Sequence, residues 1–220
     1  MNTNVSNSLE NVKFHLRSDL HIMRKLWHMG TGVAGLITYF MSGMGHMLTA
    51  QLLMGVALFG FAVEFIRMRV ESVNKVVIFF MKPFMREHEK NSMSGFPFYA
   101  LGVSLALFLF PEKIGVLAVI FLVFSDPISS YFGILYGKDK ILPNKSLQGT
   151  VAGYLTCYSV TLVYTLFYVE PSVEVLVFAI FGGLIGAISE LLSELVDDNL
   201  TIPVVSGLGL TGLNLFIPLF

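Results

Sequence analysis

The sequence contains one cysteine and few charged residues. Because Cys157 stands alone among 220 residues, an internal disulfide and a zinc site built from several cysteines are excluded. Only 13% of the residues are charged, against about 25% in a typical soluble domain. No Asp, Glu, Lys or Arg occurs from Thr31 to Val63, and the net charge of −1 gives no reason to expect a nucleic-acid partner. These absences predict an integral membrane protein.

The amino-terminal residues also lack the features of a cleaved signal. Residues 1–25 are polar and of mixed charge, without the apolar core and small-residue cleavage site of a secretory signal peptide. We expect them to form a polar cytoplasmic tail. We expect residues 26–220 to form a single transmembrane domain, because no linker in that range is long enough to separate two domains.

Hydrophobic residues, by contrast, make up 55% of the chain and gather in long runs. Seven apolar segments occupy about residues 27–43, 48–66, 96–110, 114–126, 150–168, 173–189 and 203–219. Several are shorter than the roughly 20 residues of a standard membrane span. The pattern nevertheless predicts an all-α, polytopic bundle of about seven transmembrane helices. Cys157 falls within an apolar run, so we interpret it as a packing residue.

The basic residues predict the topology. With the amino terminus inside, every Lys and Arg except Lys113 falls in a segment assigned to the cytoplasmic side, as the positive-inside rule requires. The carboxyl terminus is then predicted on the opposite side. Within residues 69–90, apolar residues recur at helical spacing among basic ones. This pattern predicts either a cytoplasmic interfacial helix or a covered helix of the bundle.

The first polar constellation surrounds Asp126, which lies between two apolar segments. A carboxylate is expensive to bury beside lipid unless it has a partner or a metal, so a functional site is the default interpretation. Pro127 suits the first turn of a new helix. One face of that helix would carry the small residues Ser129, Ser130, Gly133 and Gly137. They would either admit a ligand close to the backbone or pack against another helix.

The second constellation, residues 144–149, precedes the fifth apolar segment. If a helix begins near Thr150, its free N–H groups attract anions, Lys145 adds positive charge and Gly149 allows close approach. This combination predicts a phosphate site. The alternative is a basic loop that follows the positive-inside rule, in which Ser146 caps the helix.

The third constellation lies between the sixth and seventh apolar segments and consists of Glu190, Glu194, Asp197, Asp198 and Asn199. Four carboxylates without a nearby Lys or Arg favour a divalent cation, and Mg²⁺ is expected where phosphates are also present. The alternative is a solvated acidic loop, which suits Glu194 and Asp197 better than Glu190.

Two smaller groups lie at the ends of the first two apolar segments. Arg24 and Lys25 are most simply topogenic charges, and His28 is either a catalyst or a packed interfacial histidine. Glu64 and Arg67 are three residues apart, so they share one helix face and can form an ion pair.

Taken in order, these residues resemble the polyprenol kinase family, which includes dolichol kinase, phytol kinase and the CTP-dependent diacylglycerol kinase. The resemblance rests on Arg24-Lys25-x-x-His28, Glu64-x-x-Arg67, Asp126-Pro127 with Ser130, Gly133 and Gly137, Lys145-Ser146-x-x-Gly149, Glu190, and Asp198-Asn199-Leu200-Thr201-Ile202-Pro203. It extends from about residue 24 to residue 220. Many members have Glu where this chain has Gln148, which removes one charge beside the predicted phosphate turn.

The resemblance implies a lipid kinase that transfers a phosphoryl group from CTP, or another nucleoside triphosphate, to a polyprenol, a phytol-like alcohol or diacylglycerol. Asp126 and Asp198 would bind Mg²⁺, or one of them would accept the hydroxyl proton, with Glu190 as a second candidate base. The nucleotide would lie against Ser130, Gly133, Gly137, Lys145, Ser146, Gly149 and Asn199. Supporting roles would fall to Arg24, Lys25, His28, Glu64 and Arg67.

Two other functions fit the same residues. A CTP-dependent cytidylyltransferase acting on a phosphorylated lipid would use the same cation and nucleotide, but would release pyrophosphate instead of CDP. A non-enzymatic transporter or scaffold would place its carboxylates along a path across the membrane. The kinase interpretation requires Asp126, Lys145 and Asp198 to meet at one membrane face.

Overall fold

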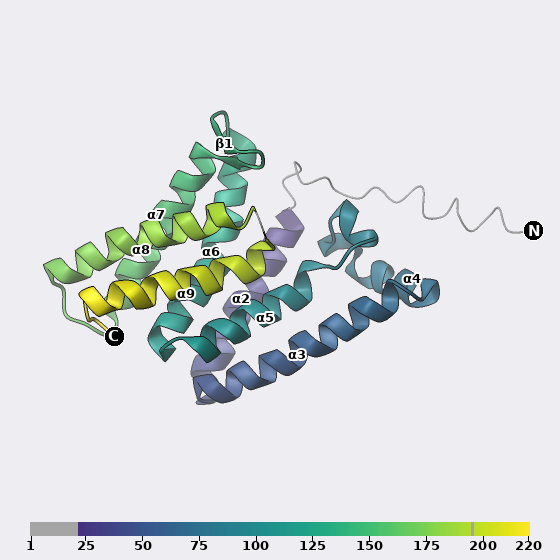
Figure 1. The fold of residues 1–220 in the computed structure, drawn as a ribbon, viewed down its shortest axis with the longest axis horizontal. Helices are drawn as coiled ribbons and strands as arrows, with labels where there is room; N and C mark the ends of the chain where they lie inside the picture. The colour runs from purple at the N-terminus through teal and green to yellow at the C-terminus, as the bar shows by residue number, and fades with distance from the viewer. Residues whose placement is uncertain (1–21, 195) are drawn as a thin grey trace, which may run out of the picture.

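A computed structural model describes residues 22–194 and 196–220 (Figure 1). Most of the predicted polar tail, residues 1–21, lies outside the described residues. The helices are α2 (Ile22–Ser42), α3 (His46–Arg67), α4 (Glu71–Met81), α5 (Gly95–Leu109), α6 (Glu112–Tyr136), α7 (Leu147–Leu166), α8 (Val173–Leu192) and α9 (Asp198–Phe216). The short elements are the 3₁₀ turns η1 (Lys82–Phe84) and η2 (Glu87–Lys90) and the strands β1 (Lys140–Leu142) and β2 (Lys145–Ser146).

Each of the seven predicted apolar segments coincides with one helix. In the described part of the chain, four helices are long and apolar enough to cross a bilayer, namely α3, α6, α8 and α9, and α5 is a shorter apolar helix. The predicted all-α membrane bundle is therefore confirmed, and the chain is an integral membrane protein. The count of seven spans stays a prediction.

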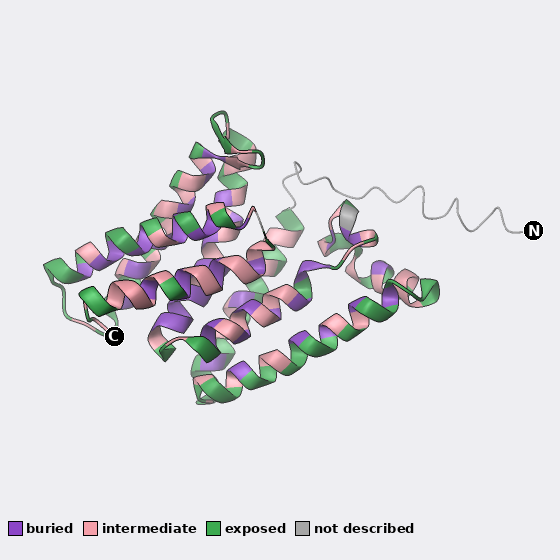
Figure 2. Ribbon diagram, in the orientation of Figure 1, coloured by how far each residue is buried: buried purple, intermediate pink, exposed green. Residues whose placement is uncertain are grey.

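The core lies along α6, in which 12 of 25 residues are buried (Figure 2). This helix packs against α2, α5, α7 and α9, so apolar side chains on every side of it are enclosed. Leu117, Phe121 and Leu122 are fully buried. In α3, by contrast, Leu58 and Phe59 are exposed on the outer face, as expected of a helix that borders lipid.

Helices α7 and α8 approach closely through small residues. A side-chain carbon added at Gly182 would clash with Thr161, and one added at Gly186 would clash with Cys157. This Gly-x-x-x-Gly pair therefore packs within the chain, as small residues do between membrane helices. Cys157 is 1% exposed, which confirms that it is a packing residue.

Two helix boundaries differ from the prediction. The helix expected to begin at Pro127 does not begin there, because α6 runs through this proline without a break. Proline removes one hydrogen bond, to the Val123 carbonyl, and packing on both sides of α6 maintains the helix. The helix predicted over residues 69–90 ends at Met81, just before Pro83, which has no N–H to continue it. Phe79 and Phe80 are exposed on α4, as an interfacial helix requires.

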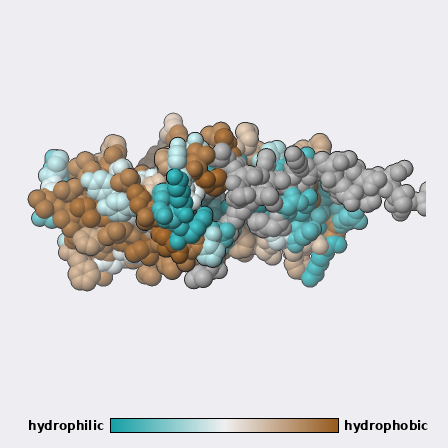
Figure 3. Space-filling view, turned by 90° about the horizontal axis from the view of Figure 1, so that it is seen from above, coloured by the Kyte–Doolittle hydropathy of each residue, from teal (hydrophilic) through white to brown (hydrophobic). Residues whose placement is uncertain are grey.

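The turn between α6 and α7 is a β-hairpin that the sequence pattern did not predict. Strands β1 and β2 are antiparallel, with Lys140 paired to Ser146 and Leu142 paired to Lys145. Figure 3 looks onto the end of the molecule that carries this hairpin, where hydrophilic residues gather at the centre beside a largely hydrophobic flank. The carboxyl terminus lies at the other end (Figure 1), where Phe220 packs against Tyr164 and Tyr168.

Candidate functional site

A cavity of about 290 Å³ lies at the hairpin end of the bundle and is called here the polar cavity. Its walls are formed by residues from several elements. These are the start of α2, the second half of α6, the hairpin, and the ends of α7, α8 and α9 that meet there. Asp126, Lys145 and Asp198 all line it. Three stretches that are distant in sequence are therefore brought together, as the kinase interpretation requires.

Opposite charges face each other across this cavity. Asp126 and Asp198 lie close enough to repel each other, while Lys145 interacts electrostatically with both carboxylates. A guanidinium nitrogen of Arg86 lies 3.5 Å from a carboxylate oxygen of Asp198. Burial acts to lower the pKa of Arg86, but the facing carboxylates, Asp198 first, raise it above its usual value. The acidic pair therefore lies in a strongly basic surrounding.

Asp197 serves mainly as a cap. Its side chain accepts hydrogen bonds from the Asn199 backbone N–H at 3.1 Å and from the Asn199 amide at 3.0 Å. Burial and repulsion by Asp198 raise the pKa of Asp197 to about 6, against the opposing effect of the Asn199 hydrogen bonds. The first turn of α9 thus holds Asp198 at the cavity, because its neighbour Asp197 fixes the helix start.

Lys145 is held at the cavity by a buried carboxylate. Its ammonium donates hydrogen bonds to Glu190 Oε1 at 2.6 Å and to Ser193 Oγ at 3.0 Å. The other oxygen of Glu190 is buried and has no hydrogen-bond partner among the described residues. Glu190, predicted as a second base, is therefore engaged in an ion pair that positions the lysine.

The small residues around the hairpin bring α6 and α7 into contact. The Ser146 hydroxyl accepts a hydrogen bond from the Gly149 N–H at 3.3 Å, so the predicted capping role is confirmed. Helix α7 begins at Leu147, three residues before the predicted start near Thr150. A side-chain carbon at Gly137 would clash with Ser146, and one at Gly149 would lie 2.9 Å from the Ser129 carbonyl.

The packing interpretation of these small residues is therefore correct, and it does not remove them from the site. Ser130, Gly133, Gly137, Ser146 and Gly149 all line the polar cavity. Their predicted role in binding phosphate stays a prediction.

The predicted pair of Glu64 and Arg67 lies outside the cavity and supports it. Arg67 is fully buried and donates to both oxygens of Glu64, at 2.9 and 2.7 Å. It also donates to the carbonyls of Glu89 and Ser92, at 2.9 and 2.7 Å. This network ties the end of α3 to the segment that carries Arg86.

Arg86 and Glu89 are functional candidates that the sequence pattern missed. Arg86 lines the polar cavity, and Glu89 binds Arg24 of α2 through both carboxylate oxygens, at 3.0 and 2.9 Å. Within residues 69–90, the helical pattern treats Arg86 only as one of the basic residues between apolar ones. The spacing of a basic and an acidic residue three apart, just after a helix-ending proline, was the available signal. Lys25, predicted as a supporting residue, also lines the polar cavity.

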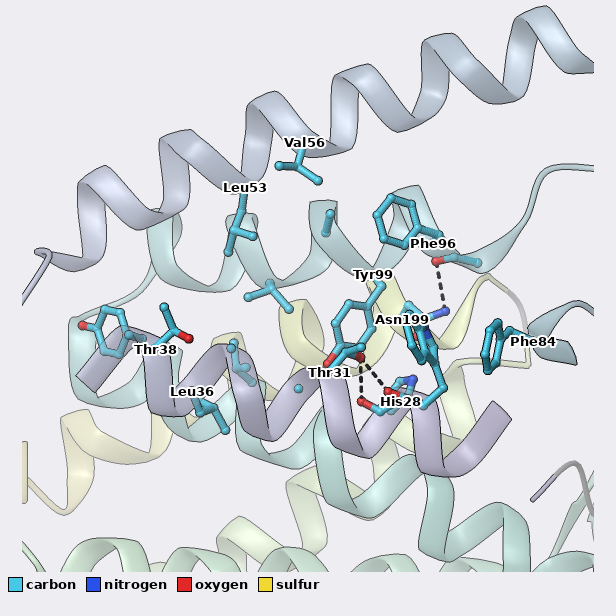
Figure 4. A pocket seen from close by; sticks show the side chains of 18 of the residues that line it. His28, Thr31, Leu36, Thr38, Leu53, Val56, Phe84, Phe96, Tyr99 and Asn199 are labelled. Carbon is cyan, nitrogen blue, oxygen red and sulfur yellow. Dashed lines mark hydrogen bonds between the residues drawn. The ribbon is translucent and has the colours of Figure 1, made fainter. Parts of the chain in front are cut away.

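A second cavity, of about 470 Å³, adjoins the first and is called here the apolar cavity. It lies between α2, α3 and α5 (Figure 4). Arg24 and His28 line both cavities. Asn199, predicted as a nucleotide or metal ligand, lines the apolar cavity, where its amide donates to the Gly95 carbonyl at 3.4 Å. Its observed contacts join α9 to α5.

The residues of the polar cavity that would hold Mg²⁺ are the two carboxylates Asp126 and Asp198. No group of three or more His, Cys, Asp or Glu within residues 22–194 and 196–220 is arranged to hold a metal ion by itself. Asp126 and Asp198 are two carboxylates that repel each other across a cavity. Because protein-bound Mg²⁺ often has one or two carboxylate ligands and completes its shell with phosphates and water, this pair suits a cation that arrives with a nucleotide.

Neither a protein-family model nor a solved structure matches the chain. Among curated proteins, CTP-dependent diacylglycerol kinase 1 of Schizosaccharomyces pombe is 38% identical over 138 residues. The match covers 56% of this chain and 62% of the relative, so the chain spans about three fifths of the relative's length. This similarity confirms the resemblance of the chain to the polyprenol kinase family and its CTP-dependent diacylglycerol kinases.

Proposed function

We propose that this protein is a lipid kinase that transfers the γ-phosphoryl group of CTP to the hydroxyl of a membrane lipid alcohol. Diacylglycerol is the first acceptor to test, because it is the substrate named for the curated relative. Polyprenols and phytol-like alcohols are the other acceptor classes. The observation that carries the proposal is that Asp126, Asp198, Lys145 and Arg86 line one cavity that adjoins an apolar one.

The proposed division of roles follows from charge. Lys145 and Arg86 would bind the phosphates, since catalysis of phosphoryl transfer consists mainly of positioning and charge neutralisation. Asp126 and Asp198 would hold Mg²⁺, which when bound would neutralise phosphate charge, or one of the two would instead accept the hydroxyl proton. Glu190 would keep the Lys145 ammonium in place through their 2.6 Å contact.

The reaction needs one proton acceptor. The lipid hydroxyl oxygen attacks the γ-phosphorus, the bond from that phosphorus to the bridging oxygen breaks, and CDP leaves with the electron pair. The hydroxyl proton would pass to Asp126 or Asp198, the carboxylates that face the cavity. Of the two, Asp198 is already engaged by Arg86 at 3.5 Å, which favours Asp126 as the base.

The proposed site faces the cytoplasm. The segments that form the polar cavity are the ones in which Lys and Arg gather, and such segments remain on the cytoplasmic side of membrane proteins. A soluble nucleotide would reach the polar cavity from that side, while the acceptor would remain in the bilayer.

A product assay tests the proposal. The purified chain in vesicles is incubated with CTP labelled in the γ-phosphate, Mg²⁺ and a panel of diacylglycerol, polyprenol and phytol. We expect a phosphorylated lipid and CDP in equal amounts. Pyrophosphate and a cytidylylated lipid would instead identify a cytidylyltransferase, and the absence of any nucleotide binding would leave the transporter or scaffold.

A further inference from the structure

The apolar cavity extends along much of α2. The residues of α2 that line it extend from Arg24 to Tyr39 on one helix face. At 1.5 Å per residue this is about 22 Å, a large part of the roughly 30 Å thickness of a bilayer core. Leu53 and Val56 of α3 form the opposite wall (Figure 4). Such a length suits an extended hydrocarbon chain.

One end of this cavity is polar. Figure 4 shows His28, Tyr99 and Asn199 close together there, away from the aliphatic walls. The rings of His28 and Tyr99 meet edge to face, with centroids 4.8 Å apart. The Tyr99 hydroxyl is buried and has no hydrogen-bond partner among the described residues. A buried hydroxyl without a partner is unfavourable, so this group is suited to a ligand that supplies one.

His28 has one ring nitrogen available for such a ligand. Its Nε2 lies 3.0 Å from the Leu122 carbonyl, and a carbonyl only accepts, so Nε2 carries the proton. In the neutral ring, Nδ1 is then the acceptor. His28 also lines the polar cavity, and the same is true of Arg24. A hydroxyl beside His28 would therefore lie at the junction of the two cavities.

We infer that the apolar cavity holds the hydrocarbon chain of the acceptor lipid, with its hydroxyl placed between Tyr99 and His28 at the mouth of the polar cavity. This inference rests on the proposed function and names the acceptor site for it. Tyr99 and His28 act as positioning residues. Because bilayer lipid is as apolar as the cavity wall, the hydrocarbon gains little from transfer, and recognition depends on the polar end and on shape.

Two glycines of α2 offer a matched pair of variants. Gly35 lines the apolar cavity, and a side-chain carbon added there would meet no other atom within 4 Å. Gly35→Leu therefore adds bulk at the cavity lining, and its first side-chain carbon meets no clash. Gly30 lies on the same helix and is exposed, and a carbon added there would also meet nothing. Gly30→Leu is the control.

Photolabelling tests the cavity without turnover. The full chain in phosphatidylcholine vesicles is irradiated with a diacylglycerol that carries a diazirine on one acyl chain, and the labelled residues are mapped by mass spectrometry. We expect labels at Leu53, Val56 and Tyr99 that excess diacylglycerol removes. Steric overpacking in Gly35→Leu should lower the extent of labelling at these residues about tenfold, and labelling of Gly30→Leu should match that of the wild type. Labels on the outer face of α3, at Leu58 and Phe59, with no effect of Gly35→Leu, would overturn the inference.

Kinetics separate the inference from the proposed function. Tyr99→Phe keeps the ring and removes one hydrogen bond, so the KM for the lipid should rise about three- to tenfold while the KM for CTP is unchanged. Equal rises in both constants would overturn the positioning role. A wild-type protein that is labelled in the cavity but makes no phosphorylated lipid would refute only the kinase. An active enzyme in which Gly35→Leu and Gly30→Leu behave alike would refute only the cavity assignment.

Discussion

The two cavities share Arg24 and His28 but are built in opposite ways. In the polar cavity, charged side chains hold one another: Lys145 contacts Glu190 at 2.6 Å and Arg86 contacts Asp198 at 3.5 Å. In the apolar cavity, most walls are hydrocarbon, and the Tyr99 hydroxyl has no hydrogen-bond partner within residues 22–194 and 196–220. The polar cavity is thus lined by paired charges, whereas the apolar cavity presents mainly hydrocarbon walls to whatever it would hold.

This contrast teaches where each kind of substitution should act. Changes in the polar cavity should affect the nucleotide and the chemical step, and changes in the apolar cavity should affect only the lipid. The predictions below probe that separation, from the largest expected effect to the smallest.

Asp126→Asn should have the largest effect. It removes a charge that faces the proposed phosphates, while the amide keeps nearly the same shape. We expect kcat to fall about 10³-fold, measured by phosphorylated-lipid formation, with no loss of thermal stability. Asp139→Asn is the control, because Asp139 lies exposed at the hairpin and accepts a hydrogen bond from Gln148 at 2.6 Å. Near-normal turnover by Asp126→Asn would remove this carboxylate from the site.

Arg67→Leu should cause the largest loss of stability. It leaves Glu64 buried without its cation and releases the segment that carries Arg86. We expect the free energy of unfolding in detergent to fall by about 3–5 kcal/mol. Lys75→Leu on α4 removes an exposed pair with Glu71 and should cause no measurable change. If the two variants were equally stable, the buried network would not be the support of the polar cavity.

Lys145→Met should weaken the binding of the nucleotide and leave the binding of the lipid unchanged. Loss of one charged contact with phosphate raises the KM for CTP about tenfold, equivalent to about 1.4 kcal/mol. Photolabelling of the apolar cavity by the diazirine lipid should not change. Lys138→Met provides the control, since Lys138 is exposed beside the hairpin. An unchanged KM for CTP would mean that Lys145 serves only to neutralise Glu190.

Ser146→Ala should have the smallest effect on stability and activity. Comparison with a second helix cap should still show whether Ser146 contributes to the site as well as to the fold. Loss of the cap at 3.3 Å lowers the free energy of unfolding by about 1 kcal/mol. Ser172 caps α8 at the other end of the bundle, with the same 3.3 Å geometry, so Ser172→Ala should cost about as much stability. Only Ser146→Ala should also raise the KM for CTP. Equal kinetics in both variants would show that Ser146 is a cap alone.

Local patterns predicted much of this molecule. Apolar runs located the seven helices, because hydrophobicity within one segment decides whether that segment is a membrane helix. The spacing of Glu64 and Arg67 predicted their ion pair, because residues three apart share a helix face. The segments that carry Asp126, Lys145 and Asp198 were predicted to meet, since the distribution of basic residues assigned them to one membrane face.

Other features depended on packing that no local pattern describes. Pro127 signalled a helix start, but neighbouring helices maintain α6 through it. Arg86 and Glu89 reach the site only because η1 and η2 fold back against α2, through contacts such as Arg24 to the Phe84 carbonyl at 3.0 Å. The roles of all these residues in binding and catalysis stay predictions until the experiments above are done.

Helix α2 borders both cavities, since Arg24 and His28 line each of them. A change in the tilt of α2 would therefore alter the polar cavity and the apolar cavity together. If a lipid fixes the tilt that also suits the nucleotide, each ligand tightens the binding of the other by the same factor, as thermodynamic reciprocity demands. Under the proposed function, CTP would then bind most tightly when an acceptor lies beside it, and this would limit hydrolysis of the nucleotide by water.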